Sequence, residues 1–287
     1  MPDDAQYFPQ MIVPTGHVEP VARRIRAFLA GRVLFDTVRA RYVWEWPGYP
    51  QYCVPAEDFT EGVLVDEDHT QRLSLGVARR HGLLSGDVAR PGSARLWTEE
   101  APPGLAGTVR IDWDAPDAWF EEDEQVFVHP RSPYTRVDAL RSGRRVRVEL
   151  DGEVLADAPS TVMVFETGLP TRYYLDRVHT DLTRLVPSDT VTRCPYKGTT
   201  SAYWSVTTNA GSHPDIAWSY DFPTRQLTPV AGLVAFYNEQ TDIFLDGRAL
   251  PRPAPVSRTA RHKSGRSDRS GRRLRTRPAC GPGTPPP

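Results

Sequence analysis

The stretch RVRVELDGEVLAD at residues 145–157 predicts a β-hairpin. Valine and leucine alternate with arginine and glutamate, which is the period of a strand with one buried face. Asp151 and Gly152 then supply the two positive-φ residues that a tight primed turn requires. The apolar residues after the turn continue as the returning strand.

The same pattern occurs a second time in the chain. The stretch RIRAFLAGRVLFD at residues 24–36 matches residues 145–157 at a constant offset of 121. At this offset YVWEWPGYPQYCVP (residues 42–55) also aligns with MVFETGLPTRYYLD (residues 163–176), and the closing segments of the two halves align after small insertions. Self-similarity of this length indicates two copies of one domain.

The other apolar runs are short, rich in β-branched and aromatic residues, and bounded by Gly, Pro, Asn or Asp, as strands are. No stretch shows helical periodicity over 12 residues or more, although residues 223–234 have room for a turn or two of helix. The predicted fold is therefore mostly β, with two tandem compact antiparallel domains.

We divide the chain into four parts. Residues 17–128 form the first repeat, which we interpret as a scaffold copy, and residues 129–143 form an extended linker rich in Pro, Ser and Gly. Residues 144–253 form the second repeat, which bears the expected site. Residues 254–287 have almost no apolar side chains, so we expect a disordered basic tail there, either a functional arm or an accidental extension.

Charge and composition narrow the classes of partner. The net charge is −1, but residues 252–287 hold ten basic residues and one acidic residue, so the rest of the chain is acidic. An acidic body is a poor candidate for specific nucleic-acid binding. The longest apolar run, residues 233–237, is too short to cross a membrane. We therefore expect a cytoplasmic protein with no membrane partner.

Three widely spaced cysteines, Cys53, Cys194 and Cys280, predict neither a disulfide framework nor a zinc site of paired cysteines. No metal site is expected from them, and the sequence leaves the question of a cofactor open. Dinucleotide, phosphate-loop, HExxH and GxSxG signatures are also absent from the printed sequence.

The strongest candidate for a site is RCPYKG at residues 193–198, because the second repeat contains this polar stretch and the first does not. Proline and glycine favour a tight turn, which we place at the rim of a cleft. The Lys197 ammonium could lower the pKa of the Cys194 thiol, so both are candidate catalytic residues. We expect Lys197 to lie near Trp218, Tyr220 or Glu166, and Lys197→Ala to cost no more than about 0.5 kcal/mol.

Other side chains of the second repeat could hold a ligand. Cations would bind a carboxylate or phosphate, and aromatic faces would stack on a ring or enclose a cation. The predicted ligand-binding residues are Glu166, Arg172, Tyr174, Tyr196, Lys197, Tyr203, Trp204, Trp218 and Tyr220.

Each of these residues also has a structural interpretation. Trp204 fits a core position better than a site, and Cys194 is more often a small apolar residue than a reactive one. For Glu166, which is repeated as Glu45, we favour a role in satisfying a buried backbone turn over general-base chemistry.

Several long motifs resemble the domain of unknown function 427 family in its tandem actinobacterial form. They are VFETGLPTRYYLD (164–176), CPYKGTTSAYWSV (194–206), AWSYDFPTRQLTPVAGLVAFYNE (217–239) and the linker region at residues 121–157. The resemblance implies a cytoplasmic bacterial protein built of β-tent-like domains, each with two antiparallel sheets. Such proteins are sometimes labelled nucleotidyltransferase-like. The sequence departs from the family pattern at Cys53, where a second tyrosine is usual, and after Pro253.

Three functions follow as hypotheses. The first is a protein that binds a small anionic or aromatic metabolite at one site in the second repeat. The second is an enzyme that depends on Cys194 or transfers nucleotides with a metal held by Glu166, Asp181 and Asp189. The third is a scaffold whose aromatic residues belong to the core. The sequence does not indicate the oligomeric state.

Overall fold

The β-hairpin predicted in each repeat forms as expected. In the computed structural model, β13 (Val146–Leu150) pairs with β14 (Glu153–Ala158), and Asp151 and Gly152 have φ values of 54° and 78°. The first repeat has the same hairpin, made of β2 (Ile25–Leu29) and β3 (Arg32–Thr37). The chain folds locally this way because only residues that tolerate positive φ can close so short a turn.

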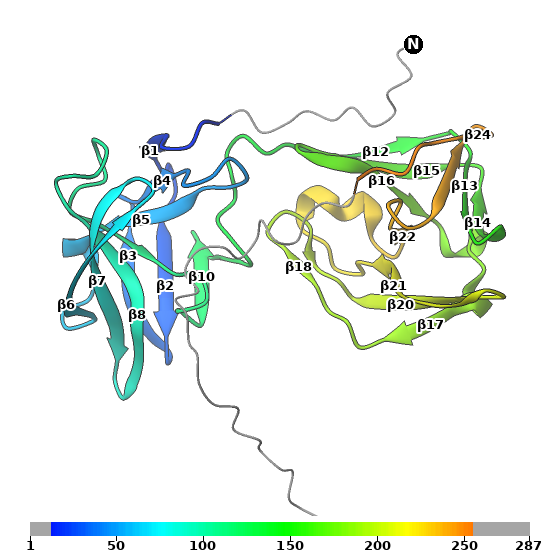
Figure 1. Ribbon diagram of the computed structural model, residues 1–287. Coiled ribbons are helices and arrows are strands. Elements are labelled where there is room, and N and C mark those ends of the chain that lie inside the picture. Colours follow the sequence, from blue (N-terminus) through cyan, green and yellow to red (C-terminus); the bar gives the residue numbers. More distant parts are fainter. Residues whose placement is uncertain (1–12, 255–287) are drawn as a thin grey trace, which may run out of the picture. The chain divides into compact units, whose positions relative to one another are not determined.

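The structure describes residues 13–254, and the chain is traced in Figure 1. Nearly all of the predicted tail lies outside these residues. The described residues form strands joined by turns and four short 3₁₀ helices. None of the helices described is long and apolar enough to span a membrane.

Each repeat contains two main antiparallel sheets. In the first repeat, the large sheet has seven strands and the small sheet has four. The large sheet runs in the order β1 (Val18–Pro20), β4 (Arg41–Val43), β5 (Gln51–Pro55), β9 (Thr108–Ile111), β8 (Val88–Trp97), β7 (Gly76–Ser85) and β6 (Leu64–Leu73). The small sheet runs in the order β11 (Glu124–Val126), β10 (Ala118–Glu121), β2 and β3, and the helix η1 (Ala56–Asp58) follows β5.

The second repeat has the same strand order. Its large sheet runs β12 (Val137–Ser142), β15 (Thr161–Glu166), β16 (Leu169–Leu175), β22 (Val234–Phe236), β21 (Gly211–Ser219), β20 (Ala202–Thr208) and β17 (Leu185–Ser188). The small sheet runs β14, β13, β23 (Asp242–Leu245) and β24 (Arg248–Ala249). The other elements are η2 (Arg177–His179), η3 (Leu182–Arg184), η4 (Arg225–Val230) and the short strands β18 (Arg193–Cys194) and β19 (Gly198–Thr199). The prediction of a mostly β chain with two like domains is confirmed.

The linker is shorter than the sequence predicts. Residues 137–142 form β12, which pairs with β15 along its whole length, from Val137 opposite Glu166 to Ser142 opposite Thr161. β12 takes the same place at the sheet edge that β1 takes in the first repeat. The second repeat therefore begins at β12, and not at residue 144.

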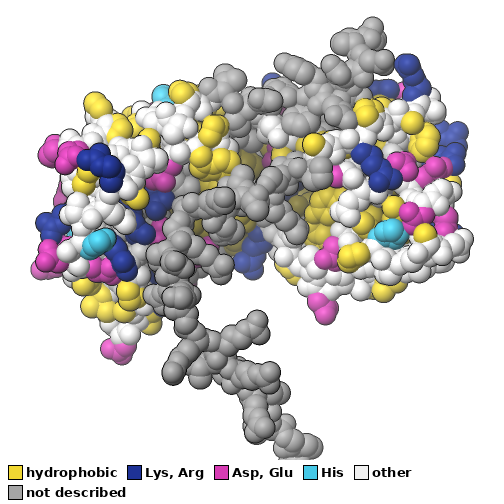
Figure 2. All heavy atoms as spheres, in the orientation of Figure 1, with side chains coloured by type: hydrophobic (Ala, Val, Ile, Leu, Met, Phe, Trp, Pro, Cys, Tyr) yellow, Lys and Arg dark blue, Asp and Glu magenta, His cyan; other side chains and the backbone are white. Residues whose placement is uncertain are grey.

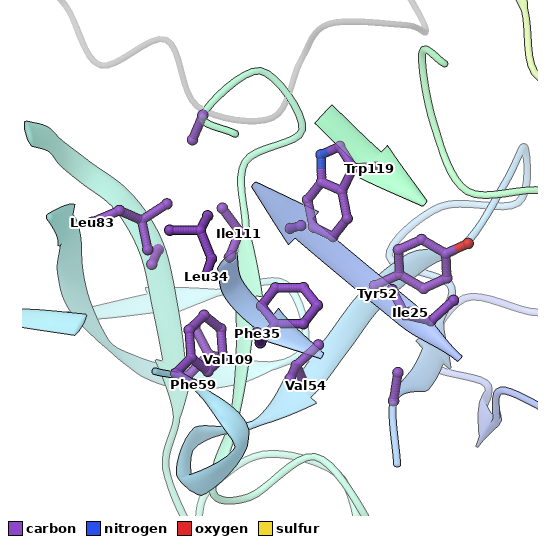
Figure 3. Close-up of a cluster of buried hydrophobic side chains, with 14 of the residues drawn as sticks. Ile25, Leu34, Phe35, Tyr52, Val54, Phe59, Leu83, Val109, Ile111 and Trp119 are labelled. Atoms are coloured by element: carbon purple, nitrogen blue, oxygen red, sulfur yellow. The ribbon is translucent and has the colours of Figure 1, made fainter. Parts of the chain in front are cut away.

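Each repeat buries apolar side chains between its two sheets. In the first repeat these include Ile25 and Leu34 from the small sheet and Val54, Val109 and Ile111 from the large sheet. Figure 3 shows these residues converging around Phe35. In the second repeat, Val146 and Val148 face Leu175, Ile216 and Val234 in the same way. The inward faces of the predicted strands thus form both cores.

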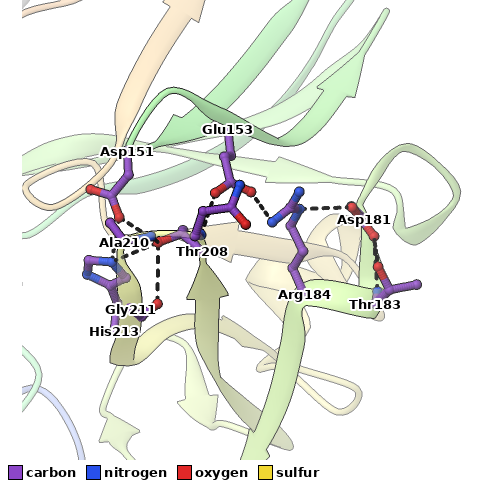
Figure 4. Close-up of polar contacts among 10 residues, drawn as sticks. Asp151, Glu153, Asp181, Thr183, Arg184, Thr208, Ala210, Gly211 and His213 are labelled. Carbon is purple, nitrogen blue, oxygen red and sulfur yellow. Dashed lines mark hydrogen bonds and ion pairs between the residues drawn. The ribbon is translucent and has the colours of Figure 1, made fainter.

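A polar cluster joins the two sheets of the second repeat (Figure 4). Asp151, in the turn of the first hairpin, accepts a hydrogen bond from Thr208 Oγ1 at 2.7 Å, and His213 Nε2 lies 2.7 Å from the same carboxylate oxygen. Thr208 and His213 come from β20 and β21 of the large sheet. Asp151 therefore holds the small-sheet turn against the large sheet.

Basic and acidic side chains are interspersed over the described surface drawn in Figure 2. Most of the exposed ones pair with each other, and the repeated hairpins have equivalent pairs. Arg24 Nε donates to Asp36 at 2.6 Å, and Arg145 Nε donates to Asp157 at 2.7 Å.

Candidate functional site

The two repeats differ most in one connection of the large sheet. In the first repeat, β6 and β7 are joined directly by Ser74 and Leu75. In the second, residues 189–201 join the equivalent strands β17 and β20, and this insertion contains the hairpin of β18 and β19. Arg193 pairs with Thr199 and Cys194 with Gly198, so the predicted turn is confirmed.

The hairpin is fixed on two sides. The Tyr196 hydroxyl accepts a hydrogen bond from the Ser132 backbone at 2.7 Å, and Arg131 Nε donates to the Pro195 carbonyl at 3.0 Å. On the other side, Thr224, which precedes η4, donates through its hydroxyl to the Tyr196 carbonyl at 2.6 Å. These bonds hold the tip of the turn in one place, as a preorganised site requires.

Lys197 extends from the turn to the Glu166 carboxylate at the end of β15, and the two side chains form a salt bridge. The side chains are only 13% and 8% exposed. Burial acts to lower the pKa of Lys197, but the Coulombic attraction of Cys194 and of Glu166 outweighs it and raises the pKa above the usual lysine value. Lys197 is therefore a buried, charged ammonium.

Cys194 lies next to this ion pair and is partly exposed. By contrast, Cys53 in the first repeat is fully buried, and its burial, followed by the charge of Glu45, raises its pKa to about 12. Of the two described cysteines, only Cys194 combines solvent access with a neighbouring cation.

The interpretation of Glu166 as the partner of a backbone turn is wrong. Its carboxylate binds the Lys197 side chain, and the equivalent Glu45 binds the Arg110 side chain at 3.1 Å. A carboxylate in the interior needs a counter-charge because burial alone disfavours its charged form. The repeats meet this need with cations from different elements.

Four of the predicted aromatic residues form a buried cluster on the outer face of the large sheet, opposite the core between the sheets. Tyr174, Tyr203, Trp218 and Tyr220 are each at most 5% exposed. Trp218 Nε1 donates to the Tyr174 hydroxyl at 3.2 Å, and the ring of Tyr237 lies 4.4 Å from that of Trp218. Leu227 and Val230 of η4 pack on this cluster.

Burial also changes the acidity of these phenols. It raises the pKa of Tyr174 to about 12, with the charge of Lys197 opposing the shift. The pKa of Tyr220 is raised still further, again chiefly by burial. Neither hydroxyl can serve as a proton acceptor in the phenolate form near neutral pH.

Trp204 is not part of this cluster. It follows Tyr203 on β20 and so points to the opposite face of the sheet, where it packs against the core between the sheets. Arg177 lies over its ring at 5.7 Å. This position agrees with the core interpretation of Trp204 and separates it from the other predicted residues.

Arg172 already has partners within the chain. Its guanidinium binds Glu239 through two hydrogen bonds of 2.5 and 2.6 Å and also contacts Asn238. It lies 5.5 Å from the ring centre of Tyr237. Sequence reasoning missed Glu239, Asn238 and Tyr237, although the quoted motif FYNE contains all three.

The carboxylates proposed for a metal do not come together. Asp181 instead accepts hydrogen bonds from the Thr183 backbone and side chain and thereby caps η3. Within residues 13–254, no three His, Cys, Asp or Glu side chains are grouped so that they could hold a metal ion.

Comparison with known families agrees with this architecture. The family described as Domain of unknown function (DUF427) matches residues 17–74 and 138–247, which is more than half of the 287 residues. The chain belongs to this family. The two matched segments cover the first part of one repeat and nearly all of the other, as a tandem DUF427 protein requires. A search of curated proteins finds no match.

Proposed function

We propose that the protein binds a small anionic or aromatic metabolite at the hairpin of the second repeat, beside Lys197, Glu166 and Cys194. The observation that carries this proposal is the position of Lys197. An insertion that the first repeat lacks delivers this ammonium to a buried carboxylate.

A buried ion pair contributes little to the free energy of unfolding, because desolvation of the two charges offsets most of their attraction. Apolar residues of similar size would serve the fold at least as well. Buried charges with shifted pKa values are concentrated at functional sites. The Lys197–Glu166 pair is therefore better explained by a ligand than by folding.

The contacts narrow the kind of ligand. Lys197 and Arg172 each have a carboxylate partner, so an anionic ligand has to share or displace Glu166 or Glu239. Tyr196 and Tyr237 are partly exposed. The rings of the buried aromatic cluster, Tyr174, Tyr203, Trp218 and Tyr220, are not. A ligand with one negative charge and a flat ring suits this combination.

Thermal-shift measurements test the proposal with benzoate, AMP and tyramine, each with and without Mg²⁺. A ligand that binds the folded state raises the melting temperature. The variant Lys197→Met/Glu166→Gln removes both charges and leaves no lone buried ion. The exposed pair Arg177–Asp221, 3.3 Å apart, provides a matched control as Arg177→Met/Asp221→Asn.

We expect at least one probe to stabilise the wild type and the control but not the Lys197→Met/Glu166→Gln variant. Equal stabilisation of both variants would place the ligand elsewhere. If no probe stabilises the wild type, this ligand class is wrong.

A second candidate function is cysteine-dependent catalysis. It is favoured by the partial exposure of Cys194 and by its Coulombic interaction with Lys197. Nucleotidyl transfer, to which the family label NTP_transf_9 refers, is a further candidate and requires a divalent cation bridging phosphates. Stabilisation by AMP that requires Mg²⁺ would favour nucleotidyl transfer over simple binding.

A structural role as a partner-binding scaffold is favoured by the deep burial of Tyr174, Tyr203, Trp218 and Tyr220. We also propose a cytoplasmic location, in keeping with the sequence expectation. Fractionation of cells that produce the tagged protein tests this location.

A further inference from the structure

Three arginines stand side by side on the outer face of the large sheet of the first repeat. Arg110 on β9 lies directly opposite Arg95 on β8, and Arg95 lies directly opposite Arg80 on β7. We call these three residues the arginine row. In the second repeat, the equivalent positions hold Ala235, Trp218 and Tyr203, which belong to the aromatic cluster.

Like charges directly opposite each other destabilise a sheet. Arg110 and Arg95 are 5% and 9% exposed, so water screens their repulsion weakly. The side chain of Arg80 is 39% exposed and forms the open end of the row. Packing alone does not explain this arrangement, because the second repeat fills the same face with uncharged side chains.

Carboxylates neutralise the charges of the three arginines to different degrees. Arg110 donates to Glu45 at 3.1 Å and to Asp112 at 2.9 Å, and Arg80 Nε lies 2.7 Å from Glu67. Arg95 donates to the backbone carbonyls of Gly92 and Ala94 instead, and its ion pair with Asp112 is 3.7 Å long. Arg95 is thus the cation with the weakest counter-charge.

Other features show that the local charges are not well matched. Arg110 Nε and Glu45 Oε1 are both buried without a hydrogen-bond partner among the described residues. Burial lowers the pKa of Arg95, and the neighbouring Arg110 and Arg80 lower it further. Burial also raises the pKa of Asp112 in spite of its two arginine neighbours.

The backbone at Gly92 allows the Arg80 side chain to approach it closely. Gly92 has a φ of 61°, and a Cβ built on it would lie 2.5 Å from Arg80 Nε and 2.7 Å from its Cζ. The Gly92 amide donates to Glu67 at 2.5 Å, and its carbonyl accepts from Arg95. Gly92 therefore allows the Arg80 and Arg95 guanidinium groups to share one small region.

We propose that the arginine row binds a small oxyanion, such as a phosphate group, between Arg80 and Arg95. A planar guanidinium offers two parallel donors to such an anion, and two neighbouring arginines match its charge and shape. The anion enters at the exposed Arg80 and supplies a closer negative charge to Arg95 than Asp112, whose carboxylate is 3.7 Å away. This site is independent of the one proposed in the second repeat.

Isothermal titration calorimetry of the full chain with pyrophosphate tests this inference, with sodium chloride at the same ionic strength as the reference. Citrate, titrated in parallel, distinguishes a phosphate group from a carboxylate as the source of the oxyanion. Arg80→Gln should weaken binding about tenfold, the effect of losing one charged hydrogen bond. Arg80→Lys keeps the positive charge but not the two parallel donors of the guanidinium, so it should weaken binding less than Arg80→Gln does.

The control is Arg72→Gln on β6 of the same sheet, an arginine whose side chain is 75% exposed and paired with Glu100 at 3.2 Å. It removes the same charge from the same repeat and should leave binding unchanged. Lys197→Met/Glu166→Gln, which removes the charges of the site in the second repeat, should also leave it unchanged. Equal weakening by Arg80→Gln and Arg72→Gln, loss of binding in the Lys197→Met/Glu166→Gln variant, or no binding beyond the chloride reference would each overturn the proposal.

Discussion

Glu45 and Glu166 occupy equivalent positions in the two repeats, yet each is neutralised by a cation from a different part of the fold. Glu45 pairs with Arg110, which lies on strand β9 of the same sheet. Glu166 pairs with Lys197, which lies on an inserted hairpin. The carboxylate is thus a shared feature of the domain, and the source of its counter-charge distinguishes the repeats.

The outer faces of the two large sheets differ in the same way. In the first repeat, three arginine side chains lie on this face beside a small apolar cluster that includes Trp97, and in the second repeat the positions equivalent to the arginines belong to the aromatic cluster. Both sheets have the same strand order. The family fold therefore supports two different surfaces on one face, which is why a site in one repeat does not imply the same site in the other.

The first prediction concerns the free energy that couples Lys197 to Glu166. Lys197→Met leaves a buried carboxylate without its partner, so it should destabilise the protein by about 3 kcal/mol. This is more than the sequence alone predicts, because the sequence does not reveal the burial of the pair. Lys197→Met/Glu166→Gln should regain most of the loss. Urea unfolding of the single and double variants measures the coupling.

The exposed pair Arg145–Asp157 serves as a control for this cycle. Water screens its charges, so its coupling energy should be smaller than that of the buried pair. Equal coupling energies for the two pairs would contradict a buried, charged Lys197.

Much of the fold could be predicted from the sequence because its signals are local. The period of two, the Asp-Gly turn and the repeat offset together predict the hairpins of both repeats. The turn at residues 193–198 is likewise local, since proline and glycine determine it. The contact between Lys197 and Glu166 agrees with the expectation that Lys197 lies near Trp218, Tyr220 or Glu166.

Other features depend on strand register, which a sequence without partners does not reveal. The pairing of β12 with β15 extends the second repeat into the expected linker. For the same reason, the sequence does not predict the ion pair of Arg172 with Glu239. Nor does it predict that Arg80, Arg95 and Arg110 lie opposite one another on adjacent strands. In each case, residues far apart in the chain become neighbours only when the sheet forms.

The second prediction concerns the reactivity of the two described cysteines. Native protein treated with iodoacetamide should be alkylated at Cys194, because that side chain is partly exposed beside Lys197. Cys53 is fully buried with its pKa raised to about 12, so it should react only after unfolding in urea. Peptide mass spectrometry separates the two sites.

Lys197→Met should slow the alkylation of Cys194 several-fold, because the Coulombic interaction between the ammonium and the cysteine is lost. Arg177→Met, which removes a charge elsewhere in the same repeat, is the matched control. A faster reaction in Lys197→Met would show that the lysine shields the thiol rather than activating it.

The third prediction concerns the backbone of the hairpin. Gly198 has a φ of 96°, where other residues are strained, and a Cβ there would lie 3.5 Å from the Thr224 nitrogen. Gly198→Ala should therefore cost about 1 kcal/mol of unfolding free energy and shift the hairpin that carries Lys197. Gly143→Ala is the control, since Gly143 has no close neighbour and no positive φ. An equal effect of the two substitutions would contradict the expected backbone strain at residue 198.

The last prediction concerns the acid sensitivity of the cluster that joins the two sheets of the second repeat. The hydrogen bond from Thr208 lowers the pKa of Asp151, and the hydrogen bond and charge of His213 contribute less. A carboxylate with a lowered folded-state pKa stabilises the fold above its unfolded pKa of about 3.9, and this contribution disappears as the pH falls through the folded pKa. Asp151→Asn keeps a residue that tolerates the φ of 54° but removes the charge. Its melting temperature should lie below that of the wild type at pH 7 and approach it as the pH falls to about 3. Thr208→Val, which removes the main cause of the shift, should behave in the same way, and His213→Gln should have a smaller effect. A difference between wild type and Asp151→Asn that stays constant from pH 7 to pH 3 would show that the carboxylate charge does not stabilise this junction.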